Sequence, residues 1–236
     1  MIPRRTLNGI EATARYGAGA NFDESQFGIA AGKVWSTGQV MVAYERVYRS
    51  ALNGANRDFF RSDQRAFGGN NYSVTRCAPG TLRAGGTAYA MPAQLTAANV
   101  GSLVAGTTNA CDDLIAQDLF PEQRYNSVNG TFTQELTPWL TVFADGFYSK
   151  RAYKRYPAYF SSTLTVPQTN AFFVRPNGVT GSSSTLDYNF INDLPRDVSV
   201  GSATNWQITP GVRVKLPSDW QFEALITYGK GNDQSD

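Results

Sequence analysis

The fold class is set by residues 206–228, which read WQITPGVRVKLPSDWQFEALITY. Apolar side chains and one proline occupy every second position of 206–216, apolar side chains do so again over 220–228, and polar residues or glycine fill most positions between them. A period of two is typical of a β-strand whose two faces differ. Residues 217–219 predict a short turn, so the stretch is expected to form a hairpin. Pro210 cannot donate a ladder hydrogen bond and predicts a bulge.

The same alternation recurs upstream in the stretches 10–16, 26–32, 40–44, 128–133 and 140–148. With the hairpin, these stretches predict about seven strands. In the last of them, Phe143 and Phe147 share a face with Asp145, so the pattern leaves the facing of that strand open. Helical periodicity is nearly absent. The sequence therefore predicts an all-β fold, an antiparallel up-and-down meander.

The connections between these strands alternate in length. Tight turns are expected near 36–38, 137–138 and 217–219, whereas the other links are a modest one at 17–23, one of about 70 residues near 50–121 and one of about 45 residues near 157–202. Short turns at one end and long loops at the other are typical of outer-membrane β-barrels. The pattern predicts that the meander is part of a large transmembrane β-barrel with long external loops.

Aromatic residues fall near both ends of the expected strands. Trp35, Trp139 and Trp220 lie beside the short turns. The residues near the opposite ends are Tyr16, Phe22, Tyr48, Tyr125, Tyr148, Trp206 and Tyr228. Because tryptophan and tyrosine settle at the level of lipid headgroups, two such groups predict the aromatic girdles of a membrane barrel.

The composition excludes several classes of protein. The 236 residues are 42% hydrophobic and 17% charged, with a net charge of +2, which argues against a disordered chain and against a nucleic-acid-binding protein. Histidine is absent, so the commonest general base and zinc ligand are missing and an enzyme is not expected. The first five residues carry charge without an apolar run behind them and do not form a signal peptide.

Several segments resemble the early barrel of TonB-dependent outer-membrane receptors. They are residues 49–60 with 65–69, the opening strand from Leu7 to Gly17, and the turn from Leu216 to Trp220. The resemblance implies that 1–236 is a partial barrel domain of a receptor in the outer membrane of a Gram-negative bacterium. Such receptors have an N-terminal plug, a TonB-contacting segment and about twenty-two strands. The implied activity is energised uptake of a scarce nutrient, such as a siderophore-type metal chelate or a carbohydrate, and the implied partners are lipid, nutrient, plug and TonB.

Two other functions fit parts of the pattern. A passive porin-type channel has the same strands and loops but no plug upstream. A soluble β-sandwich that binds carbohydrate also alternates apolar with polar residues, but it buries the apolar parity and leaves the aromatic groups at the strand ends without a role.

The two cysteines, Cys77 and Cys111, fall inside the longest loop. In the cytoplasm they would stay as free thiols, whereas an exported loop meets an oxidising compartment. We therefore expect a disulfide, which closes a ring of about 35 residues and stabilises the loop by about 3.5–4 kcal/mol in the chain-entropy model.

Basic and aromatic side chains cluster in the expected external loops. Guanidinium groups and aromatic rings suit an anionic or ring-bearing ligand. Salt bridges between neighbouring loops, or local pairing of the arginines with Asp58 and Asp63, explain the same residues without a ligand. The candidate ligand-binding residues are Arg57, Asp58, Phe60, Arg61, Arg65, Arg151 and Tyr153.

Neither a metal site nor a cofactor is expected, because Asp112-Asp113 and the acidic residues near the C-terminus lack the spacing of a calcium loop. The residues that alternate with the apolar ones along the strands are expected to line a polar lumen. They include Glu11, Arg15, Gln26, Thr131, Gln207, Arg213 and Glu223.

Overall fold

The computed structural model describes residues 6–114 and 116–236. It confirms an all-β chain with antiparallel sheets, in which 57% of the residues are in strands and 4% in helices. The chain divides into two compact units. Unit 1 runs to Leu52 and includes Pro121–Arg155 and Ser199–Asp236, and unit 2 consists of Asn53–Phe120 and Tyr156–Val198. None of the helices in the described part of the chain is long and apolar enough to span a membrane.

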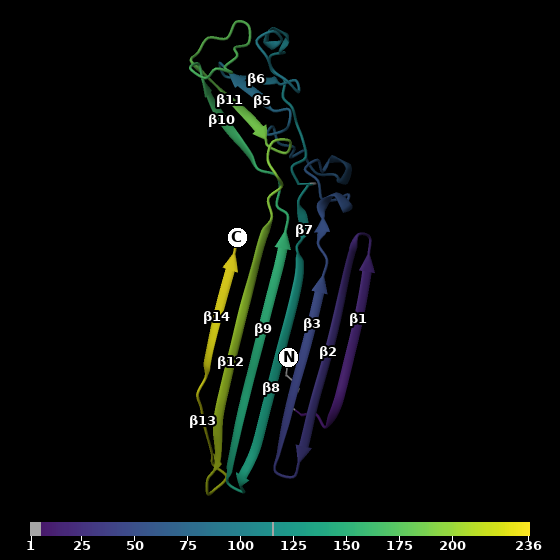
Figure 1. Ribbon diagram of the computed structural model, residues 1–236, viewed down its shortest axis with the longest axis vertical. Coiled ribbons are helices and arrows are strands. Elements are labelled where there is room, and N and C mark those ends of the chain that lie inside the picture. The colour runs from purple at the N-terminus through teal and green to yellow at the C-terminus, as the bar shows by residue number, and fades with distance from the viewer. Residues whose placement is uncertain (1–5, 115) are drawn as a thin grey trace. The chain divides into compact units, whose positions relative to one another are not determined.

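Unit 1 is one antiparallel sheet whose strands follow the chain in order, with β14 following β13 end to end along β12 (Figure 1). Its strands are β1 (Gly9–Gly19), β2 (Phe22–Trp35), β3 (Gly38–Arg49), β8 (Glu122–Thr137), β9 (Leu140–Arg155), β12 (Ser199–Lys215), β13 (Gln221–Leu225) and β14 (Tyr228–Ser235).

The strands β13 and β14 occupy one position in this sheet. Gly211 pairs with Leu225 and Ile208 pairs with Tyr228, so the register along β12 continues without a shift. The amide of Ile226 donates to the carbonyl of Pro210 at 3.1 Å, but proline has no N–H to return the bond. The predicted bulge at Pro210 is therefore wrong: one missing hydrogen bond interrupts the ladder and leaves seven strand positions in register.

The turns agree with the prediction at one end of the sheet and differ at the other. Two-residue turns follow Trp35 and Thr137. The expected link at 17–23 is wrong, because β1 and β2 continue through most of it and only Ala20 and Asn21 form the turn, with Asn21 at φ 56°. Asparagine tolerates this left-handed backbone better than most residues do.

The sheet of unit 1 is open. β1 pairs only with β2 in the described chain, and the strand formed by β13 and β14 pairs only with β12. Both outer strands therefore present unpaired backbone groups among the described residues.

Unit 2 contains a second antiparallel sheet, built from both long connections. Its order is β10 (Ser161–Pro167), β11 (Ser183–Asn189), β5 (Thr81–Ala84), β6 (Thr87–Ala90). Gly85 and Gly86 form the turn between β5 and β6 with φ of 59° and 79°, a conformation that favours glycine. The remaining short elements are η1 (Gly54–Asn56), η2 (Arg65–Phe67), η3 (Val100–Ser102), and the paired strands β4 (Leu52–Asn53) and β7 (Asp118–Phe120).

A small core and a buried carboxylate hold unit 2 together. Leu82, Ala84 and Tyr89 are the buried residues of the core. Asp187 of β11 is also buried and accepts hydrogen bonds from Thr163 at 2.7 Å, Thr75 at 2.8 Å and Arg83 at 3.0 Å. Burial by itself raises the pKa of Asp187, but these three hydrogen bonds and the charge of Arg83 outweigh it and lower the pKa below its usual value.

Polar contacts also join the points where the chain enters and leaves unit 2. The buried carboxylate of Asp118 accepts from the amide of Tyr156 at 2.8 Å and from Asn53 at 3.3 Å. The guanidinium of Arg196 lies 4.5 Å from the ring centre of Tyr156 and donates to the carbonyl of Ala116. These contacts connect the segments of unit 2 that are nearest in sequence to unit 1.

Candidate functional site

The register of the unit 1 sheet separates apolar from polar side chains. Across the sheet, Ile29 pairs with Tyr44, Tyr44 with Val128, and Val128 with Tyr148. Directly paired residues point to the same side of a sheet. The side that we call the apolar face carries Ile10, Phe27, Ile29, Val40, Val42, Val128, Phe132, Leu140, Val142, Ile208, Val212, Val214, Phe222 and Ile226.

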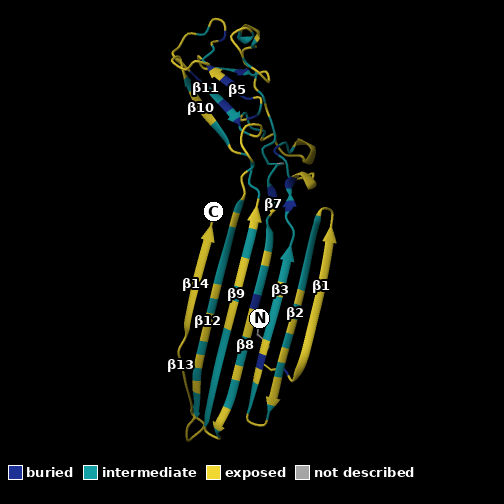
Figure 2. Cartoon of the chain, in the orientation of Figure 1, coloured by how far each residue is buried: buried dark blue, intermediate teal, exposed yellow. Residues whose placement is uncertain are grey.

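The apolar face is the more exposed side. Over residues 208–213 of β12, exposed and half-buried residues alternate: Ile208 and Val212 are exposed, whereas Thr209 and Arg213 are half-buried (Figure 2). β2 shows the same arrangement, with Phe27 and Ile29 exposed and the residues between and beside them half-buried. A soluble sheet shields its apolar side and exposes its polar side. Unit 1 has the reverse arrangement.

Aromatic residues lie on the apolar face at its short-turn end and again near the middle of the strands. Trp35 stands at the short-turn end, where its indole N–H donates to Gln134 Oε1 at 2.8 Å. Near the middle of the strands, a row crosses the sheet through Tyr44, Tyr148 and Trp206. Tyr228 joins it, with its ring centre 5.4 Å from that of Trp206. We call these four residues the aromatic row.

Two of the aromatic residues that were expected near the strand ends away from the short turns lie on the other face of the sheet. By register, Phe22 and Tyr125 belong to the opposite face of the sheet. Tyr44, which the sequence analysis did not single out, belongs to the aromatic row, and its hydroxyl donates to Asn126 Oδ1 at 2.9 Å. The aromatic residues that share this face therefore differ in part from those expected.

The opposite side of the sheet, the polar face, contains cross-strand ion pairs and hydrogen bonds. Arg213 pairs with Glu223 at 2.6 Å, and Arg49 pairs with Glu24 at 2.9 Å. The strand register places on this face all seven residues that were expected to line the polar lumen. Asp145 pairs in register with Thr131, so the facing of β9 that the sequence left open is settled, with Phe143 and Phe147 also on the polar face.

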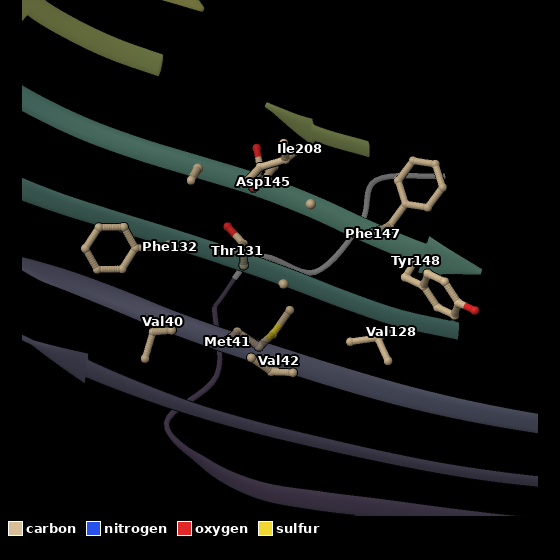
Figure 3. Close-up of a pocket in the computed structure, with 13 residues that line it drawn as sticks. Val40, Met41, Val42, Val128, Thr131, Phe132, Asp145, Phe147, Tyr148 and Ile208 are labelled. Atoms are coloured by element: carbon tan, nitrogen blue, oxygen red, sulfur yellow. The ribbon is translucent and has the colours of Figure 1, made fainter. Parts of the chain in front are cut away.

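A shallow hollow of about 370 Å³ lies in the apolar face at the middle of β3, β8 and β9. Gly130 and Gly146 are register partners at its base. Val42 and Val128 are among its walls (Figure 3). Two adjacent residues without side chains create the space, and we call it the glycine hollow.

The candidate residues of the loop 57–65, the arginine loop, belong to unit 2. Arg65 is held by Asp63, with two guanidinium contacts at 2.6 and 2.9 Å. The hydrogen bonds from the Arg65 side chain and amide lower the pKa of Asp63 to about 2, and the same pair raises the pKa of Arg65. This local pairing matches the structural alternative for Arg65.

The other candidates of the arginine loop have different surroundings. Phe60 packs against Gly54 and leaves no room there for a Cβ. Arg57 donates to the carbonyl of Asn56 at 2.7 Å. Arg61 contacts the exposed Asp58 at 3.6 Å, but its buried Nε has no hydrogen-bond partner. Arg61 is therefore the member of the loop with an unused donor.

Arg151 and Tyr153 lie in unit 1, on the polar face of β9. The ring of Tyr153 covers the backbone of its register partner Gly201 and leaves no room there for a side chain. Arg151 is exposed and has no ion pair with a described residue. The candidate residues are thus divided between the two units.

Cys77 and Cys111 form a disulfide in unit 2, with their Cα atoms 5.8 Å apart. The carbonyl of Cys77 accepts from the amide of Asn189 at 3.0 Å, which attaches the bridged segment to the end of β11. Asp112 and Asp113, next to the bridge, contact the hydroxyl of Ser62 at 2.9 and 3.1 Å. Within residues 6–114 and 116–236, no cluster of three potential metal ligands is found.

Unit 2 also contains an apolar pocket that the sequence analysis missed. Its volume is about 310 Å³, and its walls include Phe172 and Phe173 from the loop after β10 and Leu186 from β11. Phe172 is 88% exposed, and the guanidinium of Arg175 lies 5.5 Å from the ring centre of Phe173. The available signal is the short apolar run Ala171–Val174, with its two adjacent phenylalanines, in the loop after β10.

Comparison of the chain with protein-family models, curated proteins and solved structures finds no match. The two faces of unit 1 and the side chains of unit 2 are therefore the features from which a function is inferred.

Proposed function

We propose that the chain is part of an outer-membrane receptor of the TonB-dependent type, which binds a scarce nutrient and takes it up with energy from the inner membrane. Unit 1 is the part that lies in the membrane, and unit 2 belongs to its external side. The localisation that follows is the outer membrane of a Gram-negative bacterium.

The observation that carries this proposal is the reversed exposure of the unit 1 sheet. Many of its apolar side chains are exposed and lie between Trp35 at the short-turn end and the aromatic row, while Arg213 with Glu223 and Arg49 with Glu24 form ion pairs on the opposite face. Lipid is the surrounding that makes an exposed apolar face favourable, and tryptophan and tyrosine are the residues that settle at its boundaries.

The open sheet supports a place in a larger barrel. Hydrocarbon does not tolerate unpaired backbone N–H and C=O groups, so both outer strands of unit 1 need partners in the membrane. We propose that further strands of a larger barrel pair with β1 and with the strand formed by β13 and β14. A plug inside such a barrel would contact the polar face.

The soluble carbohydrate-binding module is the less favoured alternative. It requires a second layer over the apolar face of unit 1, and no described residue of unit 1 forms one, since all of its strands belong to the single sheet. This alternative predicts a protein that purifies without detergent.

A receptor and a passive porin-type channel differ in their need for energy. Cells that produce the full chain are supplied with labelled ferric chelates or oligosaccharides, with and without a protonophore. Receptor function predicts that accumulation stops when the proton-motive force is removed. Continued equilibration of the label, independent of the protonophore, would contradict the receptor and favour the channel.

For the nutrient itself, we propose contact with unit 2. The side chain of Arg61 is 40% exposed and only loosely paired with Asp58, so its guanidinium can meet an anionic group, and the pocket beside Phe172 and Phe173 accepts an apolar ring. A metal chelate or a ring-bearing sugar combines these two features.

A further inference from the structure

Basic side chains lie on the apolar face of unit 1, beyond the aromatic row. Arg46 of β3 pairs in register with Asn126 of β8, and Asn126 pairs with Lys150 of β9, so the three cross the sheet together. They are two positions farther along their strands than Tyr44 and Tyr148. Arg46 and Lys150 are exposed, and neither has an ion pair with a described residue.

Acidic residues are scarce on this part of the face. Among the described strand residues of unit 1, only Asp23 and Glu122 share the apolar face with these bases. Glu122 is held by Arg124 at 3.1 Å. Asp23 is four positions along β2 from Phe27, the register partner of Arg46, which corresponds to about 13 Å. The two bases therefore have no nearby carboxylate.

The spacing of the two bases suits a phosphate group. Arg46 and Lys150 are separated by one strand, so their backbones are about 10 Å apart and their long side chains can meet between the strands. Arginine and lysine both bind phosphate oxygens by charge-assisted hydrogen bonds, and Asn126 between them offers an amide donor.

The glycine hollow lies on the same face and on the same three strands. Its base at Gly130 and Gly146 is four positions from Asn126 and Lys150, or about 13 Å toward the middle of the sheet. The space is lined by apolar groups and passes beside the aromatic row through Val128 and Tyr148. An anionic site and an apolar groove therefore follow one another along the strands, in the order of headgroup and acyl chain.

We propose that Arg46 and Lys150 bind the headgroup phosphate of an anionic membrane lipid, of the phosphorylated lipopolysaccharide type, and that one acyl chain of this lipid occupies the glycine hollow. The inference rests on the proposed membrane location of unit 1. It assigns to these residues a fixed lipid site that is separate from the nutrient-binding unit.

The test measures lipid binding by the full chain folded in detergent micelles, with purified lipopolysaccharide as the probe and native mass spectrometry as the readout. The variant carries Arg46→Gln and Lys150→Gln together. Loss of two basic contacts is expected to weaken binding about thirty-fold. The matched control is Arg151→Gln, because Arg151 is the exposed neighbour of Lys150 on the polar face; its affinity is expected to stay within about twofold.

Two further variants separate the parts of the site. Arg46→Lys with Lys150→Arg keeps both charges and is expected to retain binding. Gly130→Val fills the hollow, and the structure accommodates it because a Cβ at Gly130 meets no atom closer than 3.9 Å. Its binding of lipopolysaccharide is expected to fall about tenfold, the change that 1.4 kcal/mol gives. Zwitterionic phosphatidylcholine and millimolar inorganic phosphate are expected not to compete.

Unchanged affinity in the double glutamine variant, or an equal loss in Arg151→Gln, would overturn the lipid site. Displacement of the lipid by inorganic phosphate would overturn it as well, because the site would then bind a free anion. Failure of the wild-type chain to insert into lipid vesicles would remove the proposed membrane location together with this inference. Insertion with normal heat-resistant β-structure, but without lipid selectivity, would remove the inference alone.

Discussion

Replacing Val212 with arginine is expected to destabilise the membrane-inserted protein by about 2–4 kcal/mol. Val212 lies on the apolar face of β12, between Val142 of β9 and Ala224 of β13, and 36% of its surface is exposed. The apolar residues of this face run from Trp206 in β12 to Leu216 directly after the strand, about 33 Å along the chain or about 25 Å in height at a strand tilt of about 40°. Val212 is near the middle of this height, where the cost of a charge in lipid is greatest.

Thr209→Arg is the control on the opposite face of the same strand. Thr209 pairs in register with Asp145 and shares a hydrogen bond of 3.1 Å with Thr227. An arginine at this position points to the polar face and lies opposite a carboxylate. Its expected cost is about 1 kcal/mol at most, the contribution of the lost hydrogen bond.

Both variants are measured as full chains folded into phosphatidylcholine vesicles and unfolded with urea, with tryptophan fluorescence and heat-dependent gel mobility as the readouts. The difference between the two free energies of unfolding is the decisive quantity. Equal costs at Val212 and Thr209 would refute the assignment of the apolar face to lipid.

Three further predictions concern unit 2. The disulfide predicts that unreduced protein from an oxidising compartment is two hydrogen atoms lighter than the dithiol by mass spectrometry; complete alkylation of Cys77 and Cys111 without reductant would contradict it. Asp187→Asn is expected to cost about 2 kcal/mol at pH 7, measured by urea unfolding. Folding lowers the pKa of Asp187 below its usual value of 3.8, so the stability that this carboxylate contributes is complete above that value and is lost as the pH falls through the lowered pKa. The difference in free energy of unfolding between the wild type and Asp187→Asn should therefore vanish in strong acid. A difference that persists there would be inconsistent with the hydrogen-bonded carboxylate. Arg65→Gln is expected to reduce folded yield without changing nutrient affinity, whereas Arg61→Gln is expected to weaken nutrient uptake with normal yield. If instead Arg65→Gln weakened uptake and Arg61→Gln reduced yield, the pairing of Arg65 with Asp63 would not distinguish a structural arginine from a ligand-binding one.

The strands of unit 1 can be predicted from the sequence because the sheet has two faces of different chemistry. Where an apolar face meets one surrounding and a polar face another, each side chain reports its direction, and the alternation from Trp206 to Leu216 follows directly. The signal is lost where side chains are small. Gly17 and Gly19 belong to β1, but without side chains they gave no alternation, and the strand end was predicted as a loop.

The interruption at Pro210 was predicted in the wrong form. Proline removes one donor, which the sequence reveals, but whether the chain adds a residue or keeps its register depends on the neighbouring strands. The continuous pairing of β12 with β9 keeps Pro210 opposite Ala144, and the interruption falls only on the side of β13 and β14.

The organisation of unit 2 is beyond a local reading of the sequence. Its strands β5 and β6 have four residues each, too few for a periodic pattern, and β5 pairs with β11 about a hundred residues later. The carboxylate of Asp187 and the pocket beside Phe172 depend on that distant pairing. The pairing of Arg65 with Asp63 joins residues two positions apart, so it could be stated from the sequence as one of two alternatives.

Site-directed spin labelling along β12 is the most direct test of the claim that one face of unit 1 contacts lipid. Nitroxide labels are placed one at a time at residues 207–214 of the full chain in lipid vesicles, and their collisions with oxygen and with a water-soluble nickel complex are measured. The account predicts a period of two, with high oxygen accessibility at the even-numbered positions and higher nickel accessibility at the odd-numbered ones. Uniform accessibility to the nickel complex at both sets of positions, or high oxygen accessibility at the odd-numbered set instead, would contradict it.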